Sequence, residues 1–333
     1  DGVLTVSGYN MQTGIRTRFP VEEQEGGELV LSARLFGDII RRMPDDMITF
    51  SSDEKLVVHL SCGDADFDIL ALSAADFPEL PEVESDKGIS LPQNELKAMI
   101  GGTSFAVSEN QARPIHTGCL FEVEDTSITV VAVDGYRLAL RRWKSEEPIG
   151  RTLKFVVPAA ALKEAEKILG DTDEACTFFL GSKHILFTIG EATLVCRLLE
   201  GEFLDWRRVL PQNQPVKLAV NVAKMTDSIE RVGLIISEKL KSPVRCRFGE
   251  NTADFRSVST IGEAHDVCQI AGDGQDMEIG FNCRYLLDAL RAIPDAECSL
   301  ELVNGLSPIV MNPCDGSGRY SYMVLPVRLK AGE

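Results

Sequence analysis

The sequence lacks long apolar runs, and no segment approaches the roughly 20 consecutive apolar residues that a membrane-spanning helix needs. It begins without the basic and apolar stretches of a signal peptide, so a cytoplasmic location is expected. Histidine is scarce, and the four present, His59, His116, His184 and His265, lie far apart. This separation disfavours a histidine-based metal or catalytic cluster. We therefore expect neither a metal site nor a cofactor.

Motifs for nucleotide chemistry are also absent. The sequence contains no GxxxxGK[ST] loop and no GxGxxG segment that opens a helix after a strand. Its nine cysteines are an odd number and include no CxxC pair. Small buried thiols in a reducing compartment are therefore expected rather than disulfides or a zinc site. These absences disfavour an enzyme, although the converging carboxylates of a metal-dependent nuclease stay open as an alternative.

Positive charge is scarce as well, with 34 lysines and arginines against 51 aspartates and glutamates and a formal net charge of −17. An acidic average argues against a protein that binds nucleic acid over its whole surface. It does not exclude a basic lining in an otherwise acidic protein, because net charge says nothing about how charge is distributed. A chain of 333 residues with 44% hydrophobic content is long enough for two or three domains of roughly 100–150 residues.

The most informative feature that is present is an internal repeat. Alternating apolar residues pass directly into the i, i+3, i+4 spacing of a helix at a Ser, Pro or Asn, which suits a helix N-terminus. Short strand-like runs separated by turn residues follow. Their loops are too short for parallel crossovers, so the unit is predicted to be βαβββ and mostly antiparallel. The strand-and-helix pattern occurs at residues 29–43, 89–100, 155–169, 218–229 and 279–293.

These units pair into larger repeats, because the copies that begin at residues 29, 155 and 279 are separated by 126 and 124 residues. The spacing predicts an α+β protein of three similar domains, each made of two βαβββ halves. The predicted domains are residues 1–85, 86–213 and 214–333. Three such domains require six helices where five are visible. We therefore expect the first half-domain to be largely missing, by roughly 35–40 residues at the start.

Four segments, in order on this threefold repeat, resemble the β subunit of bacterial DNA polymerase III, the sliding-clamp family. They are residues 133–139 (VDGYRLA), 199–211 (LEGEFLDWRRVLP), 277–288 (MEIGFNCRYLLD) and 322–329 (YMVLPVRL). The resemblance covers essentially the whole chain. It implies a head-to-tail homodimeric ring with antiparallel sheets outside and helices lining a central pore for duplex DNA. It further implies a non-catalytic processivity factor that tethers the replicative polymerase at the replisome. A repeat-built scaffold that does not bind DNA is the other alternative.

The resemblance also implies a hydrophobic pocket for a short peptide motif carried by polymerases, the clamp loader and repair proteins. Aliphatic side chains there would supply most of the affinity, and a few polar groups would orient an extended peptide. The arginines of this set are expected at the surface, because arginine is rarely buried unpaired. The family usually has Pro-Asp-Tyr at residues 204–206 and an apolar residue at His116, so an altered pocket shape is predicted. The predicted pocket residues are Val133, Gly135, Tyr136, Arg137, Leu138, Leu204, Arg208, Val209, Asn282, Tyr285, Met323, Leu325, Pro326, Val327 and Arg328.

Contacts to DNA are expected from basic residues on the helices and from the loop 108–114, which resembles a DNA-touching loop of the family. Such contacts would reach phosphates, be largely independent of sequence and weaken with salt. The alternative for each residue is an ordinary solvated charge. The predicted set is Arg34, Lys97, Asn110, Arg113, Lys167, Lys224 and Arg284.

A dimer interface is predicted from an apolar stripe in the first domain and its counterpart in the third. Leu35, Ile39 and Met43 recur at i, i+4, i+8 spacing on the first helix, and Ile235 with Ile236 matches the region that the family pairs with it. The alternative is that the stripe packs on the protein's own sheet, because every helix must bury one face.

Overall fold

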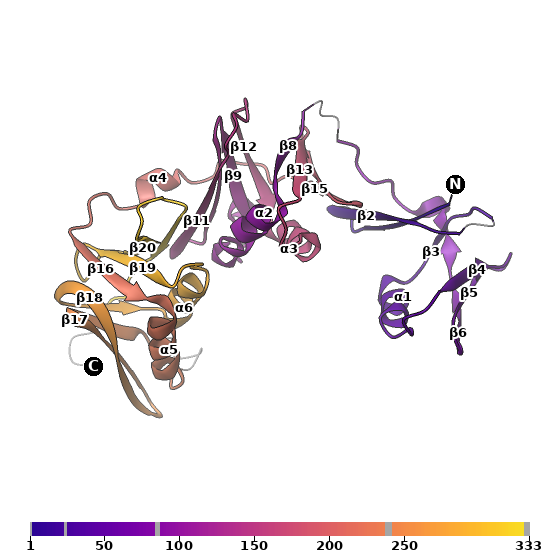
Figure 1. Ribbon diagram of the computed structural model, residues 1–333. Coiled ribbons are helices and arrows are strands. Elements are labelled where there is room, and N and C mark those ends of the chain that lie inside the picture. Colours follow the sequence, from indigo (N-terminus) through magenta and orange to yellow (C-terminus); the bar gives the residue numbers. More distant parts are fainter. Residues whose placement is uncertain (1, 23–24, 84–86, 237–241, 330–333) are drawn as a thin grey trace.

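The computed structural model describes residues 2–22, 25–83, 87–236 and 242–329. Within these ranges the chain forms three consecutive parts arranged in an arc (Figure 1). Five longer helices lie along the concave side of the arc, and the short α4 (Trp206–Val209) lies on the opposite side. Each of the five sequence repeats contains one of the longer helices, which confirms that prediction. These helices are α1 (Ala33–Ile40), α2 (Gln93–Gly101), α3 (Ala159–Ile168), α5 (Val222–Gly233) and α6 (Cys283–Arg291).

The N-cap positions of these helices lie where the sequence predicts, at Ser32, Pro92, Pro158, Asn221 and Asn282. The two asparagines cap their helices: the Asn221 side chain accepts a hydrogen bond from the backbone N–H of Lys224, and that of Asn282 accepts one from Tyr285. No helix among the described residues is long and apolar enough to cross a membrane.

All strand pairs formed by the described residues are antiparallel, and two large sheets run from one part into the next. The six-stranded sheet joins the first part to the second, because β2 pairs with β15. Its order is β1 (Val3–Tyr9), β2 (Thr13–Pro20), β15 (Ala192–Arg197), β14 (His184–Ile189), β13 (Ala175–Leu180) and β8 (Ile89–Pro92).

The ten-stranded sheet joins the second part to the third in the same way, because β11 pairs with β21. Continuous backbone hydrogen bonding therefore fixes neighbouring parts to each other. The order is β12 (Leu153–Pro158), β9 (Gly118–Glu124), β10 (Ser127–Val133), β11 (Arg137–Lys144), β21 (Tyr320–Val324), β20 (Ile309–Pro313), β19 (Glu297–Leu302), β16 (Val216–Asn221), β18 (Gly262–Phe281) and β17 (Val244–Ser259).

The ten-stranded sheet buries apolar residues on both faces. Along β10, Ile128, Val130 and Ala132 belong to the main core on the helix side, whereas Val131 and Val133 belong to a second apolar cluster. Successive side chains of a strand point to opposite faces. The second cluster, called the outer cluster below, therefore lies on the face that the longer helices leave uncovered.

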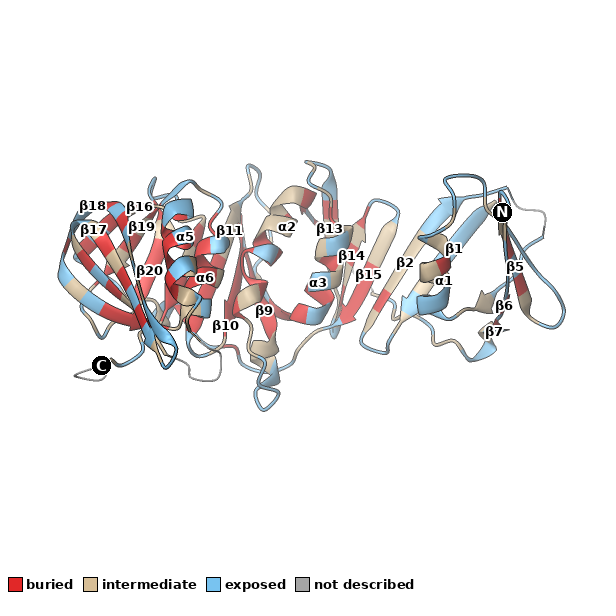
Figure 2. Cartoon of the chain, turned by 90° about the horizontal axis from the view of Figure 1, so that it is seen from below, coloured by how far each residue is buried: buried red, intermediate tan, exposed pale blue. Residues whose placement is uncertain are grey.

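The first part is smaller, and Figure 2 shows far fewer buried residues there than in the other two parts. A three-stranded sheet of β4 (Thr49–Ser52), β5 (Val57–Cys62) and β6 (Ala65–Leu70) packs against α1. Beside it lie the two-stranded sheet of β3 (Leu29–Val30) and β7 (Leu72–Ser73) and a 3-10 turn at Ala74–Asp76. Both β4 and β6 are edge strands of their sheet.

Candidate functional site

The outer cluster spans the junction between the second and third parts. Strands β9, β10, β11 and β12 contribute from one side, β20 and β21 from the other, and the segment around α4 covers part of it. The hydrophobic members of the interior are buried, and those at the margin stay partly accessible. The buried members are Leu120, Val131, Val133, Leu138, Leu140, Val156, Phe203, Trp206, Val310 and Met323, and the margin comprises Ile115, Leu199, Val209, Leu210 and Leu325.

The segment after β21 forms one margin of the outer cluster. The backbone N–H of Leu325 donates to the carbonyl of Tyr136 (2.8 Å), and that of Val327 donates to the carbonyl of Gly280 (2.7 Å). A Cβ on Gly280 would lie 2.9 Å from the Val327 carbonyl, so glycine is what permits this approach. Leu325 and Pro326 are half-buried here, whereas Val327 and Arg328 are exposed.

The α4 segment forms the facing margin. Phe203 and Trp206 are buried in the outer cluster, while Leu204 is exposed and Val209 is half-buried. Arg208 points into solvent with 87% of its side chain exposed and pairs with Asp205 at 3.1 Å. The two margins together present apolar side chains beside an exposed arginine.

Arg137 is buried, which corrects the expectation that it lies at the surface. Only 8% of it is exposed. Its guanidinium donates to Asp134 (2.9 Å), to Asp288 of α6 (2.6 Å) and to the Phe105 carbonyl (2.7 Å), and it stacks 4.3 Å from the Tyr285 ring centroid. Burial is tolerated because two carboxylates compensate the charge. Arg137 thereby ties the second part to the third next to the outer cluster.

The turn before Arg137 places an exposed aromatic ring beside this junction. Asp134 accepts backbone hydrogen bonds from Tyr136 and Arg137, and Gly135 adopts φ +90°, a conformation that favours glycine. The exposed Tyr136 ring stacks on the half-buried Tyr285 ring at 6.0 Å. Asn282, the cap of α6, is half-buried.

His116 borders the outer cluster through an edge-on contact with the Phe203 ring, at 4.9 Å between centroids. Its Nδ1 is buried and has no hydrogen-bond partner among the described residues. Burial and the neighbouring Arg113 charge lower the pKa of His116 below its usual value of 6.5. The imidazole is therefore neutral at neutral pH and acts mainly as a packing group.

The concave side differs in charge from the rest of the protein. Along the five longer helices there are eight lysines and arginines against seven aspartates and glutamates, whereas the chain as a whole has 34 against 51. The acidic excess therefore lies elsewhere. The near-neutral helices therefore repel phosphate less than the acidic average of the chain would.

Some of the predicted DNA-contacting residues form ion pairs within the described part of the chain and others do not. Lys97 pairs with Asp171 (2.9 Å), Lys167 with Glu164 (2.8 Å), and Arg284 lies 4.0 Å from Asp288. Arg34 and Lys224 are exposed and have no ion pair within the described ranges. Asn110 and Arg113 are exposed on a loop in which the Asn110 side chain accepts from the Ala112 N–H (2.9 Å).

The predicted interface stripe on α1 divides between two environments. Ile39 is only 6% exposed and lies in the core of the first part, and Met43 packs against the same core. Leu35 is 49% exposed. At the other end of the chain, Ile235 and Ile236 follow α5 and are half-buried.

Two exposed aromatic residues in the first part are not among the residues predicted from the sequence. Phe50 on β4 and Phe67 on β6 both lie in register with the buried Leu60 of β5, so all three share one face of the sheet. Both rings are exposed because α1 does not cover them. The sequence shows that Phe50 and Phe67 occupy positions of two strands that would face a core. It does not show that these two strands lie at the edges of the sheet, where the rings stay exposed.

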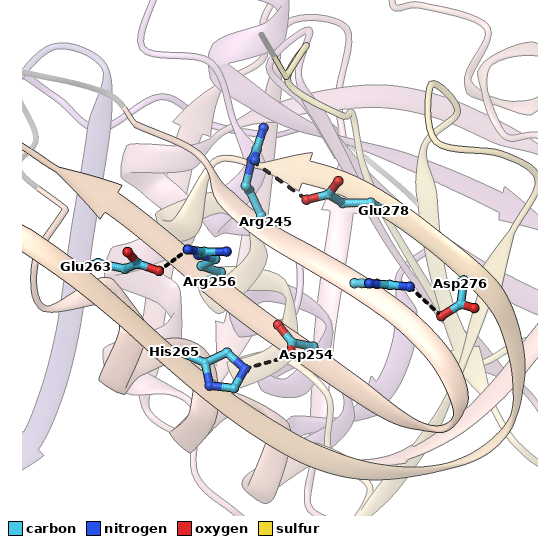
Figure 3. Close-up of a pocket in the computed structure, with 8 residues that line it drawn as sticks. Arg245, Asp254, Arg256, Glu263, His265, Asp276 and Glu278 are labelled. Atoms are coloured by element: carbon cyan, nitrogen blue, oxygen red, sulfur yellow. Dashed lines mark hydrogen bonds and ion pairs between the residues drawn. The ribbon is translucent and has the colours of Figure 1, made fainter. Parts of the chain in front are cut away.

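A hollow of about 610 Å³ lies on the β17–β18 ribbon and is lined by arginines, carboxylates and His265, as Figure 3 shows. Its arginines are paired, Arg247 with Asp276 (3.1 Å), Arg256 with Glu263 and Arg245 with Glu278, and the His265 ring contacts Asp254 (2.6 Å). Such paired charges suit a solvated sheet surface. They do not match the apolar site expected for a peptide.

The structure therefore defines a class of protein: repeated α+β domains with continuous outer sheets, helices along the concave side and an apolar site on the outside, as in DNA clamps. Family profiles of the DNA polymerase III β subunit match in succession, the N-terminal domain over residues 1–81, the central domain over 90–205 and the C-terminal domain over 207–328. The chain belongs to the DNA polymerase III β subunit family, the bacterial β sliding clamps. Its function is accordingly that of a non-catalytic processivity clamp in DNA replication, partnered with DNA and the polymerase.

Individual relatives agree with this assignment. The β sliding clamp of Staphylococcus epidermidis is 32% identical over 315 residues, which cover 92% of this chain and 82% of the relative. A putative DNA polymerase III β subunit from Eubacterium rectale superposes with a TM-score of 0.90 at 32% identity, covering 98% of this chain and 88% of the other. The Pseudomonas aeruginosa sliding clamp bound to griselimycin superposes with a TM-score of 0.91 at 28% identity, covering 98% and 89%.

Proposed function

We propose that two copies of this chain close head to tail around duplex DNA in the cytoplasm. The ring would hold the replicative polymerase, the clamp loader and repair proteins in turn through the outer cluster. The observation that carries the proposal is the separation of two surfaces. The near-neutral helices lie on the concave side, and the apolar site lies on the opposite face of the same sheet. Such an arrangement lets DNA occupy the inside while a partner is held outside.

For the partner site, an extended peptide would lie between the α4 margin and the Leu325–Arg328 margin. Partly exposed apolar side chains, including Leu204, Val209 and Leu325, are suited to accept its anchor residues. Two exposed polar groups, the Arg208 guanidinium of α4 and the Tyr136 hydroxyl, would orient its backbone.

Leu325→Ala tests this site. Truncating an interface anchor should weaken binding of a fluorescent peptide, taken from the clamp-binding segment of a replicative polymerase, by about 1–3 kcal/mol. Met11→Ala is the control, because Met11 is an exposed apolar residue in the turn between β1 and β2, outside both proposed contact surfaces. Equal affinity of the Leu325 variant and the control, measured by fluorescence anisotropy, would refute the assignment.

For ring closure, we propose that the open edge of the β4–β6 sheet meets the β17–β18 ribbon of a second copy. An uncovered strand edge can pair with another chain, and these two elements lie at opposite ends of the arc (Figure 1). Phe67 of β6 and Leu35 of α1 would supply apolar contact at one end, and Ile235 and Ile236 would do so at the other. This contact joins different surfaces, so two copies can close a ring.

Size-exclusion chromatography with light scattering tests the interface. The protein should elute as a dimer, and Phe67→Asp should shift it toward monomer because a charge would be buried at the contact. Met11→Asp offers the same chemical change at an exposed position in the turn between β1 and β2, and it should stay dimeric. A Phe67→Asp protein that keeps its circular dichroism and remains dimeric would contradict this interface.

A further inference from the structure

A buried carboxylate lies on the outer face of β9, directly beneath α4. Glu122 is 7% exposed. Its Oε2 accepts hydrogen bonds from the Trp206 indole N–H (3.0 Å) and from Arg207 Nη1 (2.7 Å), and its Oε1 lies 3.3 Å from Lys154 Nζ on the neighbouring strand. The group is thus ionised and fully engaged, and two of its three donors come from α4.

The α4 segment has little that would hold it in place by itself. It spans four residues, and the side chain of its N-cap residue, Asp205, makes no capping hydrogen bond. Isolated helical turns of this length are unstable in water. Arg207 reinforces the anchor, because its guanidinium stacks 4.2 Å from the Trp206 ring centroid and its second amino group donates to Glu124 (3.2 Å).

Within the segment, anchoring residues and margin residues are distinct. Trp206 and Arg207 engage Glu122, whereas Leu204 and Arg208 extend into solvent, and Val209 lies at the margin of the outer cluster. The contacts that hold Trp206 and Arg207 in place therefore also determine the positions of the margin residues. The two sets lie within the six residues 204–209.

We infer that Glu122 is a positioning residue for partner binding: by holding Trp206 and Arg207, it fixes the α4 margin in the arrangement that an incoming peptide meets. This inference rests on the proposed use of the outer cluster as the peptide site. Glu122 is buried beneath α4, so it would act through Trp206 and Arg207 without touching the peptide. Its effect is preorganisation, since a margin that must be ordered during binding lowers the affinity.

The titration of Glu122 gives a signature that packing alone would not. Burial raises the pKa of Glu122, but the hydrogen bonds from Arg207 and Trp206 outweigh it and hold the pKa below its ordinary value of 4.5. A carboxyl group with a lowered pKa in the folded state stabilises the fold fully at pH values above its pKa in the unfolded state. This stabilisation is lost as the pH falls through its pKa in the folded state. The anchoring of α4 should therefore loosen only below about pH 4.5.

The test compares Glu122→Gln, Trp206→Phe and the double variant. All of them carry Trp143→Phe, so that the fluorescence of variants that retain Trp206 comes from this residue alone. Affinity is measured by anisotropy with an uncharged, end-blocked peptide from the clamp-binding segment of a replicative polymerase. Glu124→Gln is the matched control, because Glu124 also pairs with Arg207 but is exposed.

Glu122→Gln should weaken peptide binding about tenfold, in line with the loss of charged hydrogen bonds, and should shift Trp206 emission. Trp206→Phe should weaken binding comparably. The double variant should bind no more weakly than the weaker-binding single variant, because the indole hydrogen bond that Trp206→Phe removes ends on the same carboxylate that Glu122→Gln replaces. Glu124→Gln should stay within about twofold. Acidification should shift the Trp206 emission of the Glu122 protein and leave that of Glu122→Gln unchanged.

Wild-type affinity in folded Glu122→Gln and Trp206→Phe proteins would overturn the positioning role while leaving the peptide site intact. Additive losses in the double variant would overturn it as well. If the parent protein binds no peptide, the proposed site fails and this inference fails with it. The outcomes for the two proposals are therefore distinct.

Discussion

Replacing Arg137 with alanine should loosen the junction between the second and third parts of the chain. The change removes the guanidinium that donates hydrogen bonds to Asp134, Asp288 and the Phe105 carbonyl. Arg137 is only 8% exposed, so water cannot readily replace these bonds. Removing one partner of a buried ion pair costs about 3–5 kcal/mol, because the remaining charge stays uncompensated. Asp134 still accepts two backbone hydrogen bonds and Asp288 is partly exposed, so a loss near 3 kcal/mol is expected.

Hydrogen–deuterium exchange with mass spectrometry measures this loss where it arises. Amides of β11 and α6 should exchange about 150-fold faster in Arg137→Ala, since each 1.4 kcal/mol is a factor of ten. Arg137→Lys should also exchange faster, because a lysine cannot reproduce the planar fork of the guanidinium. Arg208→Ala is the control, since exposed pairs contribute about 1 kcal/mol or less. Unchanged protection of β11 and α6 in Arg137→Ala would show that the pairs do not hold the junction.

Three further predictions follow from the described side chains. Burial raises the pKa of the thiols of Cys119, Cys176, Cys196 and Cys298 to about 12, so a maleimide at pH 8 should label the exposed Cys314 well before these four; early labelling of Cys176, located by mass spectrometry, would count against the packing. DNA affinity should fall steeply with salt, and Arg34→Ala or Lys224→Ala should each reduce the slope of log K against log salt by about one if the residue contacts a phosphate. An unchanged slope would make that residue an ordinary surface charge. Finally, the depressed pKa of His116 means that the unfolded state binds the proton more tightly, so folded stability should decline as pH falls below 6.5. His116→Leu should remove this decline in thermal melts, and a decline of equal size in both proteins would exclude His116 as its source.

The helices and the repeat could be predicted from sequence because both are periodic. The longer helices carry their apolar positions and their start residues within a few turns, and Asn221 and Asn282 cap the helices that they precede. The antiparallel strands followed from loop lengths alone. Local patterns of this kind do not depend on which distant segments meet.

Features that depend on distant partners could not be predicted. Arg137 is buried because Asp288, 151 residues away, meets its charge. The α4 turn lies where it does because Glu122, more than 80 residues earlier, anchors Trp206 and Arg207. For the same reason, nothing local to β2 indicates that it continues the sheet of β15.

Retention on DNA of defined topology is the most direct test of the proposed ring. Labelled protein is loaded onto nicked circular DNA with a bacterial clamp loader and ATP, and half of the sample is then cut once with a restriction enzyme before gel filtration. A closed ring should stay with the circular DNA in moderate salt and slide off after linearisation. Equal retention on circular and linear DNA, or none on either, would contradict a chain that encircles duplex DNA.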